Sequence, residues 1–331
     1  MTKLEASINN IQVAVDDAED KKVLEWLTQL DYADDHNYQR RKRQPGTGEW
    51  FLKSPNFQAW LEQEGQTMFC SGIPGSGKTI LTSTVIDYLK DHFAGDQDVG
   101  IAYIYCNLQH KGGKRSFDAR SILQGQDDRL QAEELISSLL KQIVQAMPSL
   151  PEPVRALYAK HSRDRTRPLT EEVLSTLIPV VQGCFSRRFV IVIDALDECH
   201  NSNYCRSEFL QTIFKLQKAV ERTSIFVTSR PTKEIEEEIL ASDPTPDEEF
   251  FPEYDEYELW FSRPEMMESI SRIIRYEIQA KEEDLQAYLD SQMFKFKSVI
   301  GNRVDLEHQI KERISDAVHG MCVENCPPSC R

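Results

Sequence analysis

Eight consecutive residues carry the spacing of a phosphate-binding loop. They are Gly72, Ile73, Pro74, Gly75, Ser76, Gly77, Lys78 and Thr79, which fit the pattern G-x-x-x-x-G-K-[ST]. Glycines have no Cβ and reach backbone angles closed to other residues, so the N–H groups of such a loop can point at phosphate oxygens. Lys78 is predicted to reach the β- and γ-phosphates of a nucleotide, and the Thr79 hydroxyl to ligate Mg²⁺. The competing interpretation is a glycine-rich turn without a ligand.

A cluster of acidic residues could bind the metal ion and activate the water that a nucleotide site requires. Asp194 follows the apolar run 189–193 (FVIVI), and Asp197 and Glu198 come directly afterwards. Ligands of open α/β sheets sit at the carboxyl ends of the strands, so Asp194 is predicted to hold Mg²⁺ opposite Thr79. Asp197 or Glu198 can then orient or deprotonate an attacking water. The alternative is an acidic turn at a strand end.

A third run, 224–229 (SIFVTS), ends at Arg230. An arginine at this position could reach the γ-phosphate and report whether it is present. The alternative is a surface arginine paired with a carboxylate.

Strands that alternate with helices must position these residues. Apolar, β-branched runs predict strands at 68–70, 99–106, 189–193 and 224–229. Helical spacing predicts helices behind the loop from residue 80, over 135–144, over 169–181 with Thr170 as N-cap, and over 208–219. Residues 107–130 are predicted to be an ill-ordered loop. The fold class that follows is α/β, a doubly wound, mostly parallel sheet of the phosphate-loop NTPase type.

Composition shifts divide the chain further. Residues 1–30 are predicted to be amphipathic helices that either bind a partner or pack on the chain itself. Residues 31–65 lead into the nucleotide site, irregular at first and helical from about Asn56 to Gln63. The NTPase domain spans 66–245, a smaller helical region 246–320, and a disordered tail 321–331. The basic run 40–43 is interpreted as a solvated loop, or as a nuclear-localisation or phosphate-contact segment.

Charge and composition limit the partners. The 331 residues have a formal net charge of −15 and a hydrophobic share of 40%. A negative chain lacks the basic face that nucleic acid requires, so no nucleic-acid partner is expected. No signal peptide and no membrane span are recognisable, which predicts a cytoplasmic protein with reduced thiols. His200 and Cys199 have no metal-ligand spacing. Cys322, Cys326 and Cys330 could bind zinc, but an unstructured tail is the favoured interpretation.

The combined motifs resemble the NACHT family of signal-transduction NTPases, within the class called STAND. The nearest likeness is a fungal group with a nephrocystin-like N-terminal region and ankyrin or WD repeats downstream. The resemblance covers about residues 20–321 and rests on the segments 24–32, 46–50 (GTGEW), 72–79, 192–199 (VIDALDEC) and 228–231 (TSRP).

This resemblance implies a nucleotide-controlled switch, closed with diphosphate and oligomeric with triphosphate. It also implies that residues 46–50 lie near the nucleotide base. The expected function is binding of a purine nucleoside triphosphate, ATP in preference to GTP, with slow Mg²⁺-dependent hydrolysis. Partners could be copies of the same chain or a protein bound through the N-terminal helices. The alternatives are a binding or scaffold remnant without turnover, and a small-molecule kinase.

Two departures from the family pattern modify this expectation. Residues 109–126 are longer than the family's usual link. After residues 319–321 the family continues into an apolar helix, a winged helix and repeats, whereas this chain reads CVENCPPSCR. The sequence therefore predicts that these 331 residues bind nucleotide but switch poorly by themselves.

Overall fold

Five parallel strands form one sheet. The computed structural model describes residues 18–106, 128–164, 166–199, 205–241, 272–300 and 303–324. The strand order is β2-β3-β4-β1-β5, and every neighbouring pair is parallel. The strands are β1 (Thr67–Ser71), β2 (Val99–Tyr105), β3 (Arg188–Asp194), β4 (Thr223–Ser229) and β5 (Ile273–Glu277). The predicted α/β class and its first four strands are confirmed.

Two strands inside the sheet, β3 and β4, are buried along their whole length. Every residue of β3 and of β4 is buried. Strands buried on both faces read as continuous apolar runs, because helices cover the two sides of a parallel sheet. This explains why apolar and polar residues do not alternate regularly along FVIVI and SIFVTS.

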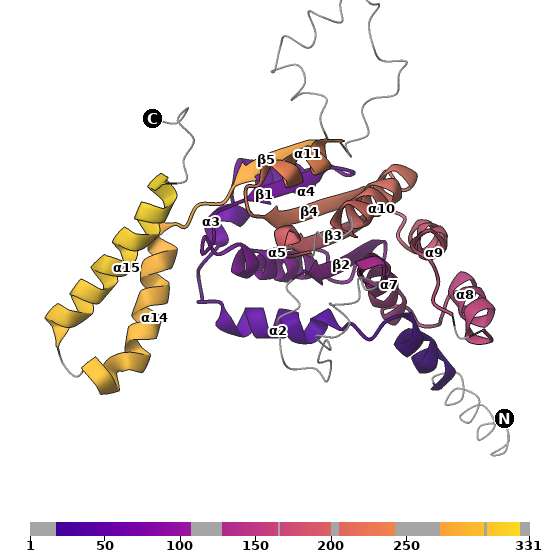
Figure 1. Cartoon of the computed structure of the whole chain (residues 1–331), viewed down its shortest axis with the longest axis horizontal. Coiled ribbons are helices and arrows are strands. Elements are labelled where there is room, and N and C mark those ends of the chain that lie inside the picture. The colour runs from indigo at the N-terminus through magenta and orange to yellow at the C-terminus, as the bar shows by residue number, and fades with distance from the viewer. Residues whose placement is uncertain are drawn as a thin grey trace, which may run out of the picture.

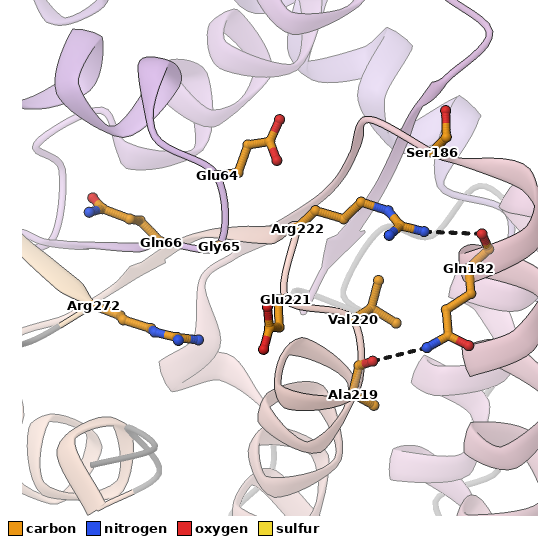
Figure 2. Close-up of a pocket in the computed structure, with 10 residues that line it drawn as sticks. All are labelled: Glu64, Gly65, Gln66, Gln182, Ser186, Ala219, Val220, Glu221, Arg222 and Arg272. Carbon is orange, nitrogen blue, oxygen red and sulfur yellow. Dashed lines mark hydrogen bonds between the residues drawn. The ribbon is translucent and has the colours of Figure 1, made fainter. Parts of the chain in front are cut away.

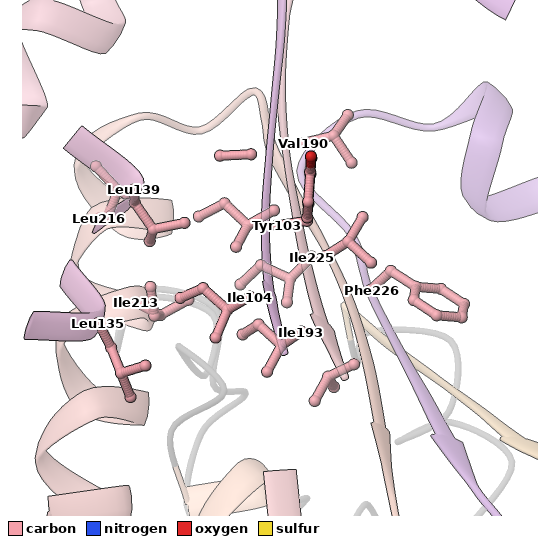
Figure 3. Packing of buried hydrophobic residues seen from close by; sticks show 14 of the residues in the cluster. Tyr103, Ile104, Leu135, Leu139, Val190, Ile193, Ile213, Leu216, Ile225 and Phe226 are labelled. Carbon is pink, nitrogen blue, oxygen red and sulfur yellow. The ribbon is translucent and has the colours of Figure 1, made fainter. Parts of the chain in front are cut away.

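Helices cover both faces of the sheet. On one face, Leu135 and Leu139 of α7 (Asp128–Gln145) and Ile213 and Leu216 of α10 (Cys205–Ala219) point toward Ile104 and Ile193 (Figure 3). Tyr103 and Phe226 belong to the opposite face (Figure 3). There Phe226 contacts the rings of Phe51 and Trp60. The doubly wound arrangement is therefore confirmed.

The remaining helices complete the two layers and the flanks (Figure 1). They are α2 (Tyr32–Lys42), α3 (Glu49–Leu52), α4 (Pro55–Glu62), α5 (Lys78–His92), α8 (Glu152–Ser162), α9 (Thr170–Cys184), α11 (Lys233–Ala241), α14 (Glu282–Ile300) and α15 (Val304–Glu324). None of the described helices combines the length and apolarity needed to cross a membrane.

Two helix predictions need small corrections. Helix α8 was not predicted from the sequence, and Pro151 precedes it as N-cap. In α9 the N-cap is Leu169 rather than Thr170. Its backbone N–H donates to Oε2 of Glu172 at 2.9 Å, so a first-turn glutamate does the capping.

The prediction that the lead-in segment begins irregularly is wrong. Residues 32–42 form α2, because the Asp31 side chain accepts the Ala33 N–H at 2.9 Å as an N-cap. The basic residues 40–42 fill the last turn of this helix, where positive charge complements the helix dipole. The basic run is therefore largely the end of a helix and not a loop.

The prediction that residues 246–320 are helical is wrong at one place. Residues 273–277 form β5, which pairs in parallel with β1 at the edge of the sheet. The sheet thus extends beyond the predicted domain limit at residue 245. Helices α14 and α15 form the described helical part of this region and lie side by side (Figure 1). Because α15 continues to Glu324, residues 321–324 are not part of a disordered tail, while 325–331 lie outside the described residues.

The described part of the N-terminal region packs on the chain itself. Residues 18–27 are helical, and Val23 and Leu27 are buried in the main core. Lys141 of α7 donates to the carbonyls of Thr28 and Leu30. This supports the packing interpretation for residues 18–30. Residues 1–17 of the predicted amphipathic segment and residues 107–127 of the predicted loop lie outside the described residues. The prediction of a loop over 107–130 is wrong at its end, because residues 128–130 form the first turn of α7.

Candidate functional site

The loop from Gly72 to Thr79 joins β1 to α5, as the motif predicts. Gly75 and Gly77 have φ angles of +83° and +87°, which strain any residue with a Cβ. Gly72 is required for a different reason. A Cβ there would lie 2.7 Å from Oγ of Ser76 and 2.8 Å from the carbonyl oxygen of Ile278. The three glycines therefore allow two left-handed turns and one close contact.

Lys78 lies across its own loop. Its Nζ donates to the carbonyl oxygens of Gly72 at 2.6 Å and of Ile73 at 2.9 Å. Burial lowers the pKa of Lys78, while the carboxylates of Asp197 and Asp194 act in the opposite direction. A cation directed into a loop at the N-terminus of a helix is the arrangement that phosphate binding needs.

Asp194 is the last residue of β3 and is fully buried. Its Oδ1 accepts hydrogen bonds from the hydroxyls of Thr82 and Thr228, each at 2.8 Å. Its Oδ2 is buried and has no hydrogen-bond partner among the described residues. Burial raises the pKa of Asp194, although the Thr79 hydroxyl and the Lys78 ammonium favour the charged carboxylate. An oriented carboxylate with one unpartnered oxygen is suited to a cation.

These residues fit a magnesium ion. Mg²⁺ is usually bound by one or two protein oxygens together with substrate phosphates and water. The unpartnered Oδ2 of Asp194 and the Thr79 hydroxyl at the start of α5 are such oxygens. Within the described ranges, no group of three or more His, Cys, Asp or Glu side chains forms a metal cage. Cys326 and Cys330 are outside those ranges.

Asp197 and Glu198 lie in a short turn, η1 (Leu196–Glu198), that follows β3. Ala195 precedes it with φ of +56°, a left-handed angle for which a small side chain is an advantage. The Ala195 N–H donates to Oγ1 of Thr228 at 3.1 Å, which fixes the start of the turn. Burial and the neighbouring Asp197 raise the pKa of Glu198, which suits a general base.

Arg230 is half-exposed and pairs with the acidic turn. Its Nε lies 2.9 Å from Oδ2 of Asp197, and its Nη2 lies 3.8 Å from Oε1 of Glu198. The structure thus brings together the proposed sensor and both proposed acids, which come from the ends of β3 and β4. It also contains the carboxylate partner that the alternative interpretation of Arg230 requires.

Two hydroxyls of this site were missed by the sequence analysis. Thr82 lies four residues after Lys78 on the same face of α5, and Thr228 is near the end of β4. A signal existed for Thr82, since helical spacing places it one turn behind the loop lysine. The role of Thr228 depends on the pairing of β4 with β3, which no local pattern shows.

The segment 46–50 packs between the nucleotide-loop helix and α14. A Cβ on Gly48 would contact the side chains of Leu81 and Thr84 on α5 at 3.3 and 3.5 Å. Oδ2 of Asp284 accepts hydrogen bonds from the Gly48 N–H at 3.0 Å and from Trp50 Nε1 at 2.9 Å. Its predicted proximity to a nucleotide base stays a prediction.

A pocket of about 700 Å³ lies elsewhere. It is lined by the residues that precede the strands, among them Gln66, Ser186, Arg222 and Arg272 (Figure 2). In a parallel sheet these residues lie at the end opposite the phosphate loop. The guanidinium of Arg222 donates to the carbonyl oxygens of Phe185 and Gln182, and so holds the end of α9 beside the start of β4. This pocket is not part of the loop and carboxylate site.

Comparison with known proteins gives one family match. The sequence profile of the family described as "Nephrocystin 3, N-terminal" matches residues 46–230. This range includes the phosphate loop, the acidic turn and Arg230. No curated protein matches the chain.

Several solved structures are similar to the chain. Drosophila ORC bound to DNA has 12% identity and a TM-score of 0.38, covering 83% of this chain and 55% of that chain. A DNA replication initiation factor has 15% identity and a TM-score of 0.36, with coverage of 84% and 60%. The Walker-type ATPase of Pyrococcus abyssi has 14% identity and a TM-score of 0.41, with coverage of 83% and 64%. The chain therefore spans less than two thirds of the length of each.

Proposed function

Because the chain belongs to the Nephrocystin 3, N-terminal family, whose profile spans both halves of the site, we propose that it binds a nucleoside triphosphate with Mg²⁺ and hydrolyses it slowly. One observation carries this proposal. Asp194 is fully buried with Oδ1 held by two threonine hydroxyls, and its Oδ2 is unpartnered beside a glycine-rich loop and its lysine. Such a carboxylate needs a cation, and such a loop needs an anion.

Different residues are proposed to bind the nucleotide and to promote its hydrolysis. The N–H groups of residues 72–79 and Lys78 hold the phosphates, and Thr79 and Asp194 hold the metal. A bound Mg²⁺ would neutralise charge that develops on the phosphate oxygens. Glu198 accepts the proton of the attacking water, since its pKa is raised toward neutral pH and its ion pair with Arg230 is long at 3.8 Å. Asp197 positions Arg230.

Beyond binding and hydrolysis, we propose that the bound nucleotide switches the chain between two states, as in the NACHT family. Arg230 is held by Asp197 when no phosphate is present and turns to the γ-phosphate when a triphosphate binds. ATP is the expected nucleotide, with GTP as the alternative. Copies of the same chain are one candidate partner of the triphosphate form, although the sequence predicts that these 331 residues switch poorly by themselves. Nucleic acid is not an expected partner, since the net charge of −15 opposes phosphate backbones.

Nucleotide binding is tested with Lys78→Ala. The variant is expected to lose binding of a fluorescent ATP analogue, while its free energy of unfolding changes by only about 1 kcal/mol, because two partly buried hydrogen bonds are lost. Lys53→Ala is a matched control, since Lys53 is exposed and, within the described residues, its ion pair is with Glu49 alone. Binding by Lys78→Ala equal to that of the unaltered chain would contradict the site.

Measuring phosphate release with and without an acceptor distinguishes hydrolysis from the alternative functions. Hydrolysis predicts phosphate release in the absence of any acceptor. A small-molecule kinase predicts release or transfer only with an acceptor, and a scaffold remnant predicts binding without turnover. Light scattering with diphosphate and with a non-hydrolysable triphosphate tests the switch. A defined oligomer formed only with the triphosphate would support it, and an unchanged mass would count against it.

A further inference from the structure

Two buried thiols meet directly behind the acidic turn. Sγ of Cys199 lies 3.0 Å from Sγ of Cys106, and the two residues are only 7% and 3% exposed. They come from segments 93 positions apart in the chain. The site described above uses neither of them. Cys184 offers a contrast, because its sulfur lies 3.8 Å from Sδ of Met147.

The backbone ties both cysteines to the site. The Cys106 N–H donates to the carbonyl oxygen of Asp194 at 3.0 Å, so Cys106 extends the pairing of β2 with β3. Cys199 follows Glu198 directly and closes η1 through its N–H to the carbonyl oxygen of Leu196 at 3.1 Å. Any movement of the Cys199 sulfur toward Cys106 therefore pulls on the turn that carries Asp197 and Glu198.

We propose that Cys106 and Cys199 are a redox modification site, at which a peroxide converts the two thiols to a disulfide that shuts down turnover. This inference rests on the proposed function, because it regulates the same site. One thiol is oxidised by hydrogen peroxide to a sulfenic acid with release of one water. The second thiol then attacks that sulfur, and the S–S bond forms as a second water leaves. Both sulfurs are oxidised, and the peroxide is reduced to two waters.

The geometry determines what the bond changes. A disulfide requires an S–S distance of about 2.05 Å, so the two sulfurs must approach by about 1 Å. Cys106 is anchored in the sheet ladder, whereas Cys199 sits at the end of a three-residue turn. The turn gives way more easily, which displaces the Glu198 carboxylate from the position it needs for proton transfer. Errors of about 1 Å in such a position are costly in catalysis.

The reduced form is the resting state. Both thiols are buried, so a peroxide seldom reaches their sulfurs. Reaction with peroxide is therefore slow and requires sustained oxidant. A dithiol reductant reverses it by exchange.

The full chain is treated with hydrogen peroxide, its remaining thiols are alkylated, and linked peptides are identified by mass spectrometry. In parallel, phosphate release from ATP is measured before oxidation, after oxidation and after dithiothreitol. We expect a Cys106–Cys199 linkage, a fall in phosphate release on the order of a hundredfold as the general base is displaced, and recovery on reduction. Peptide mapping separates this linkage from any formed by Cys322, Cys326 or Cys330.

Variants decide whether this pair is responsible. Cys106→Ala and Cys199→Ser are expected to keep their phosphate release under peroxide, whereas Cys184→Ala, the matched control, is expected to lose it. Peroxide that leaves Cys106 and Cys199 reduced, or that links them without slowing phosphate release, would overturn the inference. An untreated chain that releases no phosphate counts against the proposed function alone, because the Cys106–Cys199 linkage is detected by mass whether or not the chain turns over ATP.

Discussion

Arg230 binds both carboxylate oxygens of Asp197. Its backbone N–H donates to Oδ1 at 2.9 Å, and its guanidinium Nε lies 2.9 Å from Oδ2. Both oxygens of Asp197 are therefore bound, whereas Oε1 of Glu198 lies 3.8 Å from the same guanidinium. This difference assigns unequal roles to two adjacent acids that the sequence alone left interchangeable.

The first prediction follows from that inequality. Glu198→Gln removes the proposed base but keeps the shape of the side chain, so phosphate release is expected to fall by about 10²–10⁴-fold while nucleotide affinity is kept. Asp197→Asn removes a charge that positions Arg230, and a smaller loss is expected. Single-turnover phosphate release and equilibrium binding measure the two effects. A larger loss in Asp197→Asn than in Glu198→Gln would reverse the assignment.

The second prediction concerns the two threonines that orient Asp194. Thr82→Val and Thr228→Val remove the hydroxyls that hold Oδ1 but keep the volume. Groups that orient a metal ligand typically contribute 10–100-fold to metal affinity, so the Mg²⁺ concentration for half-maximal turnover is expected to rise by about tenfold. Thr82→Ser should restore it, because serine keeps the hydroxyl. Loss of activity that excess Mg²⁺ does not recover would indicate a purely structural effect.

Sequence patterns predicted the parts of this site that are local in the chain. The loop 72–79 and the run FVIVI followed by Asp194 are each read from a few consecutive residues. The contacts of Thr228 with Asp194 and of Asp284 with Trp50 join distant segments, and only the fold brings them together. The engagement of Asp197 by Arg230 likewise depends on β3 and β4 lying side by side.

The errors in the fold have similar causes. Tyr32–Lys42 is a strongly polar segment, and its helix is specified by caps and terminal charges more than by an apolar stripe. Strand β5 has five residues and lies at the sheet edge, where only part of its surface is buried. Its isoleucines also fit a helical pattern. Both elements depend on the tertiary contacts that the sequence pattern does not contain.

The third prediction concerns Arg188, a buried cation without a carboxylate partner in the described residues. Its guanidinium donates to the carbonyl oxygens of Trp60, Leu61 and Gln63 and to Oγ of Ser224. Burial lowers its pKa to about 10, so it remains charged at neutral pH. Arg188→Met is expected to lower the free energy of unfolding by about 3 kcal/mol, because several buried carbonyls lose their donor.

Urea unfolding measures this loss, and the neighbouring arginine provides the control. Arg187 is exposed and forms an ion pair with Asp96, so Arg187→Met is expected to change the free energy of unfolding by less than about 1 kcal/mol. Equal effects of the two substitutions would show that the carbonyl contacts of Arg188 contribute little.

The last prediction is a pH dependence of stability that arises at His36. Its Nε2 lies 3.0 Å from Oδ1 of Asp87 on α5, and its Nδ1 lies 3.0 Å from the Tyr105 hydroxyl. A neutral ring fits this arrangement, since it donates to Asp87 and accepts from Tyr105. Burial and the nearby Lys90 and Arg40 lower the pKa of His36, although Asp87 acts against them.

A pKa lowered in the folded chain means that the unfolded chain binds this proton more tightly. The contribution of His36 is therefore complete above the unfolded pKa of about 6.5 and is lost as the pH falls toward the lower folded value. Between pH 7.5 and 5.5, the free energy of unfolding of the unaltered chain is expected to fall more steeply than that of His36→Gln. His92→Gln, which changes an exposed histidine on the same helix as Asp87, should leave the difference in place. Identical pH profiles for the unaltered chain and His36→Gln would show that His36 titrates alike in both states, and that the contact of α2 with α5 does not depend on its protonation.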